Sequence, residues 1–347
     1  MKHWSNRGVW AALGAAALFG LGTPLAKLLL GETSPWLLAA LLYLGSGVGL
    51  FVFRWLTRAA RVRLSLIETA WLLGATVTGG MAAPVLLMWG LTSMPASGAS
   101  LLLNAEGVFT ALVAWFVFRE NFDRRIALGM ALIVAGAVVL SWPGETRFGA
   151  ALPALSVLAA CLSWAIDNNL TRKVSLTDAT FIAMTKGLVA GTVNLALALW
   201  IGSTMPAALT ILAAGGVGFI SYGVSLVLFV VAMRYLGTAR TGAYFSTAPF
   251  AGAFAAILLL GEPVTLKLLA AGLLMACGVW LHLTERHEHE HTHEILDHEH
   301  EHEHDAHHQH EHTRPVLPGT RHTHGHHHGL ITHTHSHFPD THHRHDH

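Results

Sequence analysis

Apolar residues in this chain fall into long runs separated by short polar connections. Each run approaches the roughly 20 residues that an α-helix needs to cross the hydrocarbon core of a bilayer. The runs cover residues 9–30, 36–56, 69–91, 97–118, 126–142, 152–170, 179–201, 209–235, 242–260 and 266–283. No alternating barrel pattern is visible, and lipid offers no partners to backbone polar groups, so such runs must be helices. The sequence predicts an all-α membrane protein with ten transmembrane helices.

Composition supports a membrane protein and divides the chain in two. Of 347 residues, 52% are hydrophobic and 12% charged, against roughly 25% charged in an ordinary soluble protein. Residues 1–284 carry a formal charge of +8, and residues 285–347 carry −8 with neutral histidine. Cys161 and Cys277 lie inside apolar runs without metal-ligand spacing, so neither a disulfide framework nor a thiolate site is expected.

Basic residues occur in every second connection, which orients the chain by the positive-inside rule. They are Lys2 and Arg7, then Arg54, Arg58, Arg61 and Arg63, then Arg119, Arg124 and Arg125, then Arg172 and Lys173, then Arg234 and Arg240. The first apolar run is too long for a signal peptide and is expected to stay as an uncleaved helix. The sequence predicts a multi-pass protein of the inner or plasma membrane with both termini in the cytoplasm.

The two halves of the apolar region resemble each other at an offset of 142 to 145 residues. Phe19, Leu25 and Lys27 align with Trp164, Leu170 and Arg172, and Ala99, Ala111 and Glu120 align with Thr241, Ala253 and Glu262. Five spans per copy would give the copies opposite orientations. Such inverted repeats are typical of secondary transporters, whose site lies between the halves near the midplane. Chance similarity between two segments rich in small apolar residues is the alternative.

Four stretches carry a family resemblance: LFGLGTPLAK, FTALVAWFVFRE, CLSWAIDNNLTRK and FAGAFAAILLLGEPVTLK. They resemble the EamA-type transporters of the drug/metabolite transporter superfamily. The resemblance implies two inverted five-helix repeats, at residues 8–142 and 150–284, around a central cavity lined mainly by helices one to four and six to nine. It also implies export of small organic solutes, with no cofactor required. Glu106, the Asp167-Asn168-Asn169 triplet and the histidine-rich end are not general marks of that family.

Ionisable residues inside a membrane are costly unless they are paired or face a wet cavity, so each is a functional candidate. Glu106 lies nine residues into its span, about 13 Å down a core roughly 30 Å thick. It is the foremost candidate for binding substrate or exchanging a proton, and a neutral carboxyl bonded to a neighbouring helix is the alternative.

Asp167 and Lys186 fall at similar depths on consecutive antiparallel helices, where they can form an ion pair that gates the inner mouth or joins two helices. Asn168 and Asn169 can hydrogen-bond a zwitterionic or polar solute, or simply hold helices together. Lys27 is expected to reach the outer surface. The remaining candidates are Asn104, Thr23 beside the helix-bending Pro24, and the aromatic residues Trp164, Tyr222 and Tyr244, for which packing is the alternative.

Residues 285–347 hold 24 of the 26 histidines and no long apolar run, so we expect a disordered cytoplasmic tail. Neutral imidazole suits zinc, nickel and cobalt, which predicts a multi-site metal-binding segment. The candidate ligands are His287, His289, His291, His293, His298, His300, His302, His304, His324, His326, His327 and His328. Sensing of pH is the competing interpretation, because unperturbed imidazoles titrate near pH 6.5.

The leading hypothesis is a secondary-active exporter of a small organic metabolite or drug-like solute, proton-coupled through Glu106, with the tail as a metal- or pH-responsive regulator. The first alternative is a divalent-metal exporter, which fits poorly because Glu106 and Asp167 differ in depth by about 9 Å and no histidine lies centrally. The second is a membrane-anchored metal sensor or store. Motifs of hydrolases, metalloproteases and nucleotide-binding enzymes are absent, so an enzyme is not expected. The expected partners are a small molecule, the bilayer and divalent metal ions, without nucleic acid, and a homodimer is left open.

Overall fold

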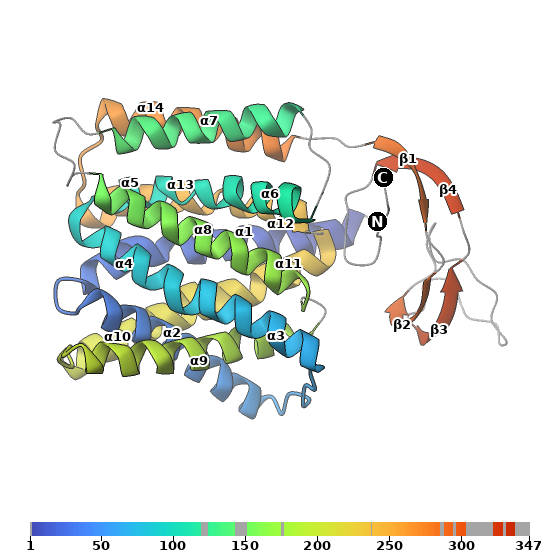
Figure 1. The fold of residues 1–347 in the computed structure, drawn as a ribbon, viewed down its shortest axis with the longest axis horizontal. Coiled ribbons are helices and arrows are strands. Elements are labelled where there is room, and N and C mark those ends of the chain that lie inside the picture. Colours follow the sequence, from blue (N-terminus) through green and yellow to red (C-terminus); the bar gives the residue numbers. More distant parts are fainter. Residues whose placement is uncertain are drawn as a thin grey trace. The chain divides into compact units, whose positions relative to one another are not determined.

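The computed structural model describes residues 2–118, 124–142, 151–174, 177–236, 238–284, 288–293, 296–302, 322–328 and 331–336. The chain divides into two compact units, Met1–Glu285 and Arg286–His347, which we call the helical unit and the histidine-rich tail. In its described part, the regular structure of the helical unit is entirely helical, as the sequence predicted (Figure 1). The helices of the first half are α1 (Lys2–Leu29), α2 (Pro35–Leu56), α3 (Leu66–Ala75), η1 (Thr76–Ala82), α4 (Ala83–Ser93), α5 (Ala96–Leu102), α6 (Ala105–Phe118) and α7 (Arg124–Ser141). Those of the second half are α8 (Leu152–Arg172), α9 (Ala179–Trp200), α10 (Ala208–Val217), η3 (Gly218–Val224), α11 (Ser225–Leu236), α12 (Thr238–Phe245), α13 (Ala248–Leu260) and α14 (Leu266–Leu283).

Helical residues occupy each of the predicted apolar runs. Within the described residues, seven continuous helices are long and apolar enough to cross a membrane, and Ala127–Ser141 and Leu266–Leu281 are shorter apolar helices. Large apolar side chains also cover the outside of the unit: Trp55 is 72% exposed, Leu209 78% and Leu266 86%. Such surface is favourable against lipid rather than water. That all ten runs span a membrane as two inverted repeats stays a prediction.

Two of the long helices contain one π-helical segment each. The segment η1 joins α3 to α4, and η3 joins α10 to α11, without leaving the helix. Two other helices are interrupted by a short turn: α5 and α6 are separated at Leu103 and Asn104, and α12 and α13 at Ser246 and Thr247. Both kinds of irregularity release backbone groups from the regular hydrogen-bond ladder, and at membrane depth such groups need partners inside the protein.

Helix ends are fixed by local polar contacts. Ser65 and Glu68 form a reciprocal capping box at the start of α3, with the Ser65 N–H donating to Oε2 of Glu68 at 2.8 Å. Past the end of α13, Gly261 adopts a left-handed conformation with φ of +64°. The carboxylate of the next residue, Glu262, accepts hydrogen bonds from the N–H groups of Ala96 and Ser97 at 2.7 and 2.8 Å. Glu262 thereby caps α5, which belongs to the other half of the chain.

Helices of the two halves pack against each other throughout the unit. The pair α2 and α9 and the pair α7 and α14 make extensive contacts, and α7 runs alongside α14 in Figure 1. The α2–α9 crossing brings backbone against backbone, since a Cβ atom on Gly187 would lie 2.5 Å from the N atom of Gly47. Small residues permit this approach, which is how helices associate in lipid. Further across the unit, α1 packs on α11 and α13, while α8 packs on α4 and α6.

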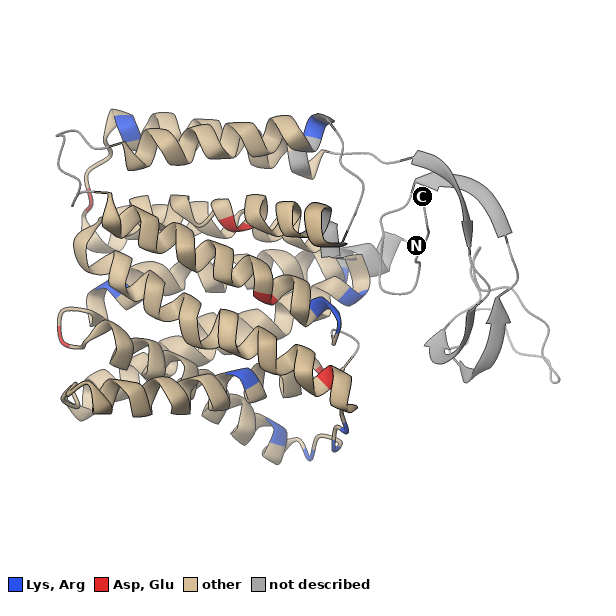
Figure 2. Ribbon diagram, viewed as in Figure 1, with Lys and Arg blue, Asp and Glu red and all other residues tan. Residues whose placement is uncertain are grey.

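Charged residues are distributed unevenly over the helical unit. Figure 2 shows most of the described Lys and Arg near one end of the bundle, with fewer at the opposite end. A few acidic and basic residues lie between the two ends, within helices that are otherwise uncharged (Figure 2). Two of the sequence candidates, Asp167 on α8 and Lys186 on α9, are buried charged residues.

The histidine-rich tail contains four described strands: β1 (Glu288–His293), β2 (Leu296–His302), β3 (His322–His328) and β4 (Ile331–Ser336). The strand β1 pairs antiparallel with β4, and β2 pairs antiparallel with β3. The sequence predicted no regular structure here. The alternation of histidine with another residue has the two-residue period of a strand, which accounts for the difference. His287 and His304 lie outside the described residues, whereas the other ten candidate ligands fall within β1, β2 and β3.

Candidate functional site

A small cavity lies inside the helical unit, between helices from both halves. Its volume is about 60 Å³, which is room for one or two water molecules and far below the roughly 300–1,000 Å³ of typical ligand pockets. The cavity is therefore nearly closed in this conformation. Its lining residues are Phe19, Tyr43, Glu106, Trp164, Asp167, Asn168, Lys186, Ser221, Tyr222, Ser225, Leu226, Phe229 and Phe245.

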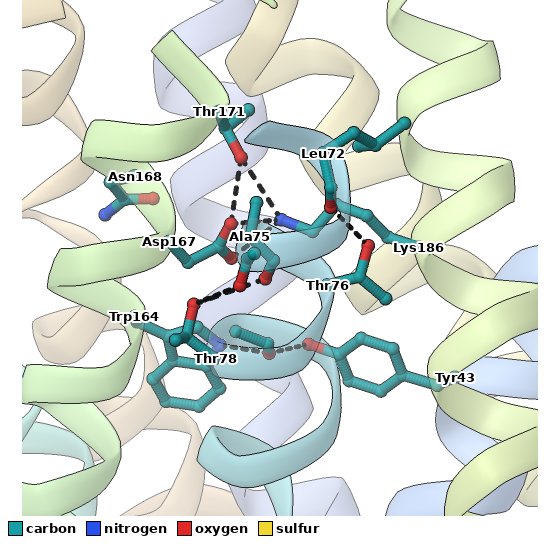
Figure 3. Close-up of polar contacts among 12 residues, drawn as sticks. Tyr43, Leu72, Ala75, Thr76, Thr78, Trp164, Asp167, Asn168, Thr171 and Lys186 are labelled. Atoms are coloured by element: carbon teal, nitrogen blue, oxygen red, sulfur yellow. Dashed lines mark hydrogen bonds and ion pairs between the residues drawn. The ribbon is translucent and has the colours of Figure 1, made fainter. Parts of the chain in front are cut away.

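A buried ion pair between Asp167 and Lys186 forms one polar centre of the cavity (Figure 3). The Nζ atom of Lys186 lies 2.6 Å from Oδ1 and 2.7 Å from Oδ2 of Asp167. The Thr171 hydroxyl, one helical turn further along α8, donates to Oδ1 at 2.8 Å and lies 3.4 Å from Nζ. Both charged side chains are buried. The ion pair predicted from depth along two antiparallel helices is confirmed.

The π-helical segment η1 packs directly on this ion pair through Gly79. A Cβ atom on Gly79 would lie 1.7 Å from Oδ2 of Asp167, so no larger residue fits without moving the carboxylate. The Gly79 carbonyl accepts hydrogen bonds from the Tyr43 hydroxyl at 2.7 Å and from Nε1 of Trp164 at 3.0 Å. The glycine thus joins α2, η1 and α8 at one point.

The Gly79 carbonyl lacks its usual hydrogen-bond partner within the helix because of the residues that follow it in the sequence. In a regular α-helix this carbonyl would accept from the N–H of Ala83, but that group donates to Thr78 instead. The next residue is Pro84, which has no N–H to donate. Tyr43 and Trp164 supply the missing partners, because a carbonyl buried at this depth needs them.

Glu106 forms a second polar centre, in the first turn of α6 after the interruption at Asn104. Nδ2 of Asn168 donates to Oε1 of Glu106 at 2.7 Å. Asn168 follows Asp167 directly on α8, and Figure 3 shows it directed away from Lys186. From sequence, Glu106 and Asp167 were treated as separate because they differ in depth. In the structure both line the same cavity, since a difference in depth does not determine which sides of two helices face each other.

Aromatic rings make up the rest of the wall. The Phe19 ring lies 5.7 Å from Trp164, 5.8 Å from Tyr222 and 5.3 Å from Phe245, measured between ring centroids. The Tyr43 and Tyr222 rings are 5.5 Å apart. Trp164 and Tyr222 were candidates from sequence.

Phe19, Tyr43, Phe229, Phe245, Ser221 and Ser225 also line the cavity and were missed by the sequence analysis. Phe19 had a usable signal, because it aligns with Trp164 between the two halves. Ser221 and Ser225 had another, since polar residues four positions apart share one helix face.

The other sequence candidates do not line the cavity. Asn169 donates to the Ala165 carbonyl at 2.9 Å, and Asn104 donates to the Leu101 carbonyl at 3.1 Å. Thr23 is buried in α1, and Tyr244 packs in a separate apolar cluster with α1 and α11. Lys27 does not simply reach the surface: Nζ donates to the carbonyls of Leu91 and Met94, the latter at 3.1 Å. Its cation therefore lies at the C-terminal end of α4, where a positive charge is favourable.

A further ion pair, not predicted from sequence, joins the end of α2 to the start of α9. Nη1 of Arg54 lies 2.8 Å from Oδ1 of Asp178 and 2.5 Å from Oγ1 of Thr180. Asp178 also caps α9 by accepting from the N–H groups of Thr180 and Phe181. Partial burial alone would raise the pKa of Asp178, but the hydrogen bonds from Thr180, Phe181 and Arg54 outweigh burial and lower the pKa below its ordinary value.

The cavity is not arranged as a metal site. Among the described residues, no group of three or more His, Cys, Asp or Glu side chains is placed to hold a metal ion. The cavity offers two carboxyl groups and one ammonium, of which Asp167 and Lys186 are already paired. Such a set suits an organic solute better than a divalent metal.

Comparison with known proteins identifies the family. The model of the EamA-like transporter family matches residues 6–142 and again residues 151–284. This chain belongs to the EamA-like transporter family. EamA-like transporters are multi-pass membrane proteins, so the protein is a membrane transporter of the drug/metabolite transporter superfamily and not an enzyme.

Several proteins share this EamA-like sequence or fold. An uncharacterized transporter of Methanothermobacter thermautotrophicus is 30% identical over 285 residues, which are 77% of this chain and 83% of that protein. A probable amino-acid metabolite efflux pump of Salmonella typhimurium is 31% identical over 172 residues, covering 49% of this chain and 55% of the pump. A solved crystal structure has the same fold, with a TM-score of 0.62 and 16% identity over 80% of this chain and 95% of that chain.

Proposed function

We propose that this EamA-like transporter exports a small organic solute by alternating access through the central cavity. The observation that carries the proposal is the cavity itself, which lies between the two halves and is lined by two acids, one base, an amide and several aromatic rings. A nearly closed cavity of about 60 Å³ is expected of a conformation between two open states. Export is proposed, rather than import, because the Salmonella typhimurium relative is a probable efflux pump.

The alternating mechanism rests on two inverted five-helix repeats, at residues 8–142 and 150–284. Three regularities support them. The segment η3 begins 142 residues after η1, and α13 begins 143 residues after α6. The packing of α1 on α11 and α13 has its counterpart in that of α8 on α4 and α6. The family model also matches the chain twice. In such repeats, rocking of one half against the other exposes a fixed site to each side in turn.

The orientation proposed for the protein places both termini in the cytoplasm. Its support is the gathering of Lys and Arg toward one end of the helical unit (Figure 2), since basic connections stay on the cytoplasmic side. Arg54 and Asp178 would then join α2 to α9 near the cytoplasmic surface. The membrane concerned would be the inner or plasma membrane.

Glu106 is the proposed coupling group. Its carboxyl group faces the cavity and accepts a hydrogen bond from Asn168. A carboxyl group inside a membrane that can exchange its proton with either side provides a route for proton antiport. Asp167 is less suited to this task because its carboxyl group already contacts Lys186 and accepts a hydrogen bond from Thr171.

A second proposal concerns the histidine-rich tail, which we suggest binds divalent metal such as zinc, nickel or cobalt and regulates transport. The register of β2 and β3 sets His298 opposite His326, His300 opposite His324 and His302 opposite His322. Imidazole is a preferred ligand of these metals, and ten of the candidate histidines fall within β1, β2 and β3. Delivery of metal to the cavity is less well supported, since the described cavity residues include neither histidine nor a ligand cluster.

The test is solute- and metal-resolved flux in proteoliposomes containing the purified full-length chain. An imposed proton gradient should drive organic solutes from a mixed metabolite pool, identified by mass spectrometry, and Glu106→Gln should abolish this flux. Glu32→Gln is the matched control, because Glu32 lies in the α1–α2 connection and accepts from Thr210 outside the cavity. Flux of zinc or nickel without any organic flux would overturn the proposal.

A further inference from the structure

The cavity contains more acid than base. Glu106, Asp167 and Lys186 are its carboxyl and amino side chains. Lys186 contacts both oxygens of Asp167, and Thr171 donates to the same carboxylate. One acid and one base therefore compensate each other, and the second acid is left over.

Glu106 is the uncompensated acid. Among the described residues, its carboxylate makes no ion pair, and its only hydrogen bond comes from the neutral amide of Asn168 to Oε1. An ionised carboxylate with so little compensation is unstable inside a membrane, so it requires either a proton or another cation.

The aromatic wall favours the same sign of charge. Phe19 lies in contact with Trp164, Tyr222 and Phe245, so several rings gather around one small space. The face of an aromatic ring is negative and attracts a cation within about 6 Å of its centroid, most strongly where water is excluded. The hydroxyl of Tyr43 is already committed to the Gly79 carbonyl and is less available to a ligand. Carboxylate and rings together disfavour an anion.

We propose that the solute taken by this cavity is an organic cation bearing an aromatic or other flat apolar group, and that this cation and a proton compete for Glu106. The inference rests on the proposed function and names its substrate class. Binding of a monovalent cation releases one proton from Glu106, so the charge at the site is unchanged. When the cavity faces the other side, a proton replaces the cation, and exchange is electroneutral.

The other titratable groups near Glu106 are less suited to exchanging a proton for the cation. The element α7, which packs on α6, contributes Arg125, whose guanidinium lies over Trp280 and donates to Thr284. The remaining titratable groups near Glu106 or in the cavity are Cys161 and Asp167 on α8, Tyr43 on α2, Tyr222 on η3 and Lys186 on α9. Asp167 and Lys186 are fixed by each other, and thiol and phenol groups ordinarily ionise well above neutral pH. Glu106 is thus the group that can exchange a proton without breaking an existing ion pair.

The experiment measures binding of benzyltrimethylammonium, a permanent cation with one ring, to the purified full-length protein by calorimetry. Titrations in buffers of different ionisation heat count the protons released. We expect about one proton per bound cation while Glu106 is protonated, with affinity rising up to about tenfold per pH unit over that range. Phenylacetate and benzyl alcohol, as anionic and neutral ring compounds, should bind at least about tenfold more weakly.

Glu106→Gln should remove proton release and the pH dependence and weaken cation binding, while its amide oxygen can still accept from Asn168 and preserve the fold. Glu32→Gln is the control and should behave as the parent protein. The inference is overturned if the cation does not bind, if it binds without releasing protons, or if Glu106→Gln leaves binding unchanged.

The experiments distinguish failure of the proposed transport function from failure of the cation inference. Cation binding with proton release, but no flux of any solute in proteoliposomes, would support the site and overturn transport. Phenylacetate flux that Lys186→Met abolishes would support transport and overturn the cation inference.

Discussion

Gly79 and Asp167 are in such close contact that a Cβ atom on Gly79 would lie 1.7 Å from Oδ2 of Asp167. The contact places the π-helical segment η1 against the ion pair on α8 and α9. It also leaves the Gly79 carbonyl in reach of Tyr43 and Trp164. One glycine therefore determines the positions of both charged and aromatic parts of the cavity wall.

Gly79→Ala is expected to abolish transport and destabilise the protein. The new methyl group must displace the Asp167 carboxylate from Lys186 or move η1 away from Trp164. Overpacking of this kind costs about 1–3 kcal/mol. The measurements are solute flux in proteoliposomes and thermal unfolding in detergent. Gly216→Ala is the matched control, because a Cβ atom there meets nothing within 4 Å and alanine favours the helix by about 0.5–1 kcal/mol. Equal behaviour of the two variants would contradict the close contact.

Removing one partner of the Asp167–Lys186 ion pair should lower the free energy of unfolding more than removing both partners. Asp167→Asn leaves a buried ammonium and Lys186→Met leaves a buried carboxylate, and loss of one partner of a buried pair costs about 3–5 kcal/mol. In the double variant neither charge remains, so its free energy of unfolding should lie above that of either single variant. A double-mutant cycle followed by denaturant unfolding of the solubilised protein measures this coupling. Additive losses would show that the two charges do not stabilise each other.

The ion pair between Arg54 and Asp178 at the start of α9 predicts how the stability of the folded state changes as the pH falls. The lowered pKa of Asp178 means that its carboxylate stabilises the folded state above the ordinary aspartate pKa of about 4, and that this contribution is lost as pH falls through the lower folded value. Asp178→Asn keeps a capping residue but loses the charge. We expect it to be less stable than the parent at pH 7, by no more than about 1 kcal/mol at this partly exposed site. The difference should vanish in strong acid.

Thermal unfolding between pH 7 and pH 2 checks this response. Arg61→Gln is the control, because Arg61 is exposed in the connection between α2 and α3. This variant should keep the pH profile of the parent protein. A difference between Asp178→Asn and the parent that grows on acidification would mean that the carboxylate does not stabilise the folded state.

Phe19 occupies a central place in the aromatic wall, so its loss should impair solute handling more than folding. Phe19→Ala removes contacts with Trp164, Tyr222 and Phe245 and should raise the KM for transport by about tenfold, equivalent to 1.4 kcal/mol. Phe19→Tyr keeps the ring and should recover most of the affinity. The measurement is the concentration dependence of flux. An unchanged KM in Phe19→Ala would place the solute elsewhere.

The sequence predicted helices and the ion pair because both depend on quantities that run along the chain. Bilayer thickness sets the length of each apolar run, and the rise per residue placed Asp167 level with Lys186. Contacts between side chains on different helices could not be predicted from these quantities. That Asn168 meets Glu106, that Lys27 reaches the end of α4, and that Pro84 releases the Gly79 carbonyl to two other helices all depend on how helices are rotated against each other. Phe19 is intermediate, because its alignment with Trp164 in the repeat already suggested an equivalent position.

The histidine-rich tail should bind zinc without contributing to the fold of the helical unit. The chain divides into compact units at Glu285, so truncation after that residue should leave the thermal unfolding of the helical unit unchanged. The full-length protein should bind several zinc ions, and the truncated protein should bind none at the same free zinc concentration. Because metal requires neutral imidazole, and the unperturbed pKa is about 6.5, zinc affinity should fall steeply between pH 7 and pH 5.5. Zinc stoichiometry by equilibrium dialysis, with solute flux measured in parallel, separates storage from regulation. If zinc changes flux only when the tail is present, the tail regulates the transporter, whereas zinc retained by the truncated protein would place the metal site among the helices.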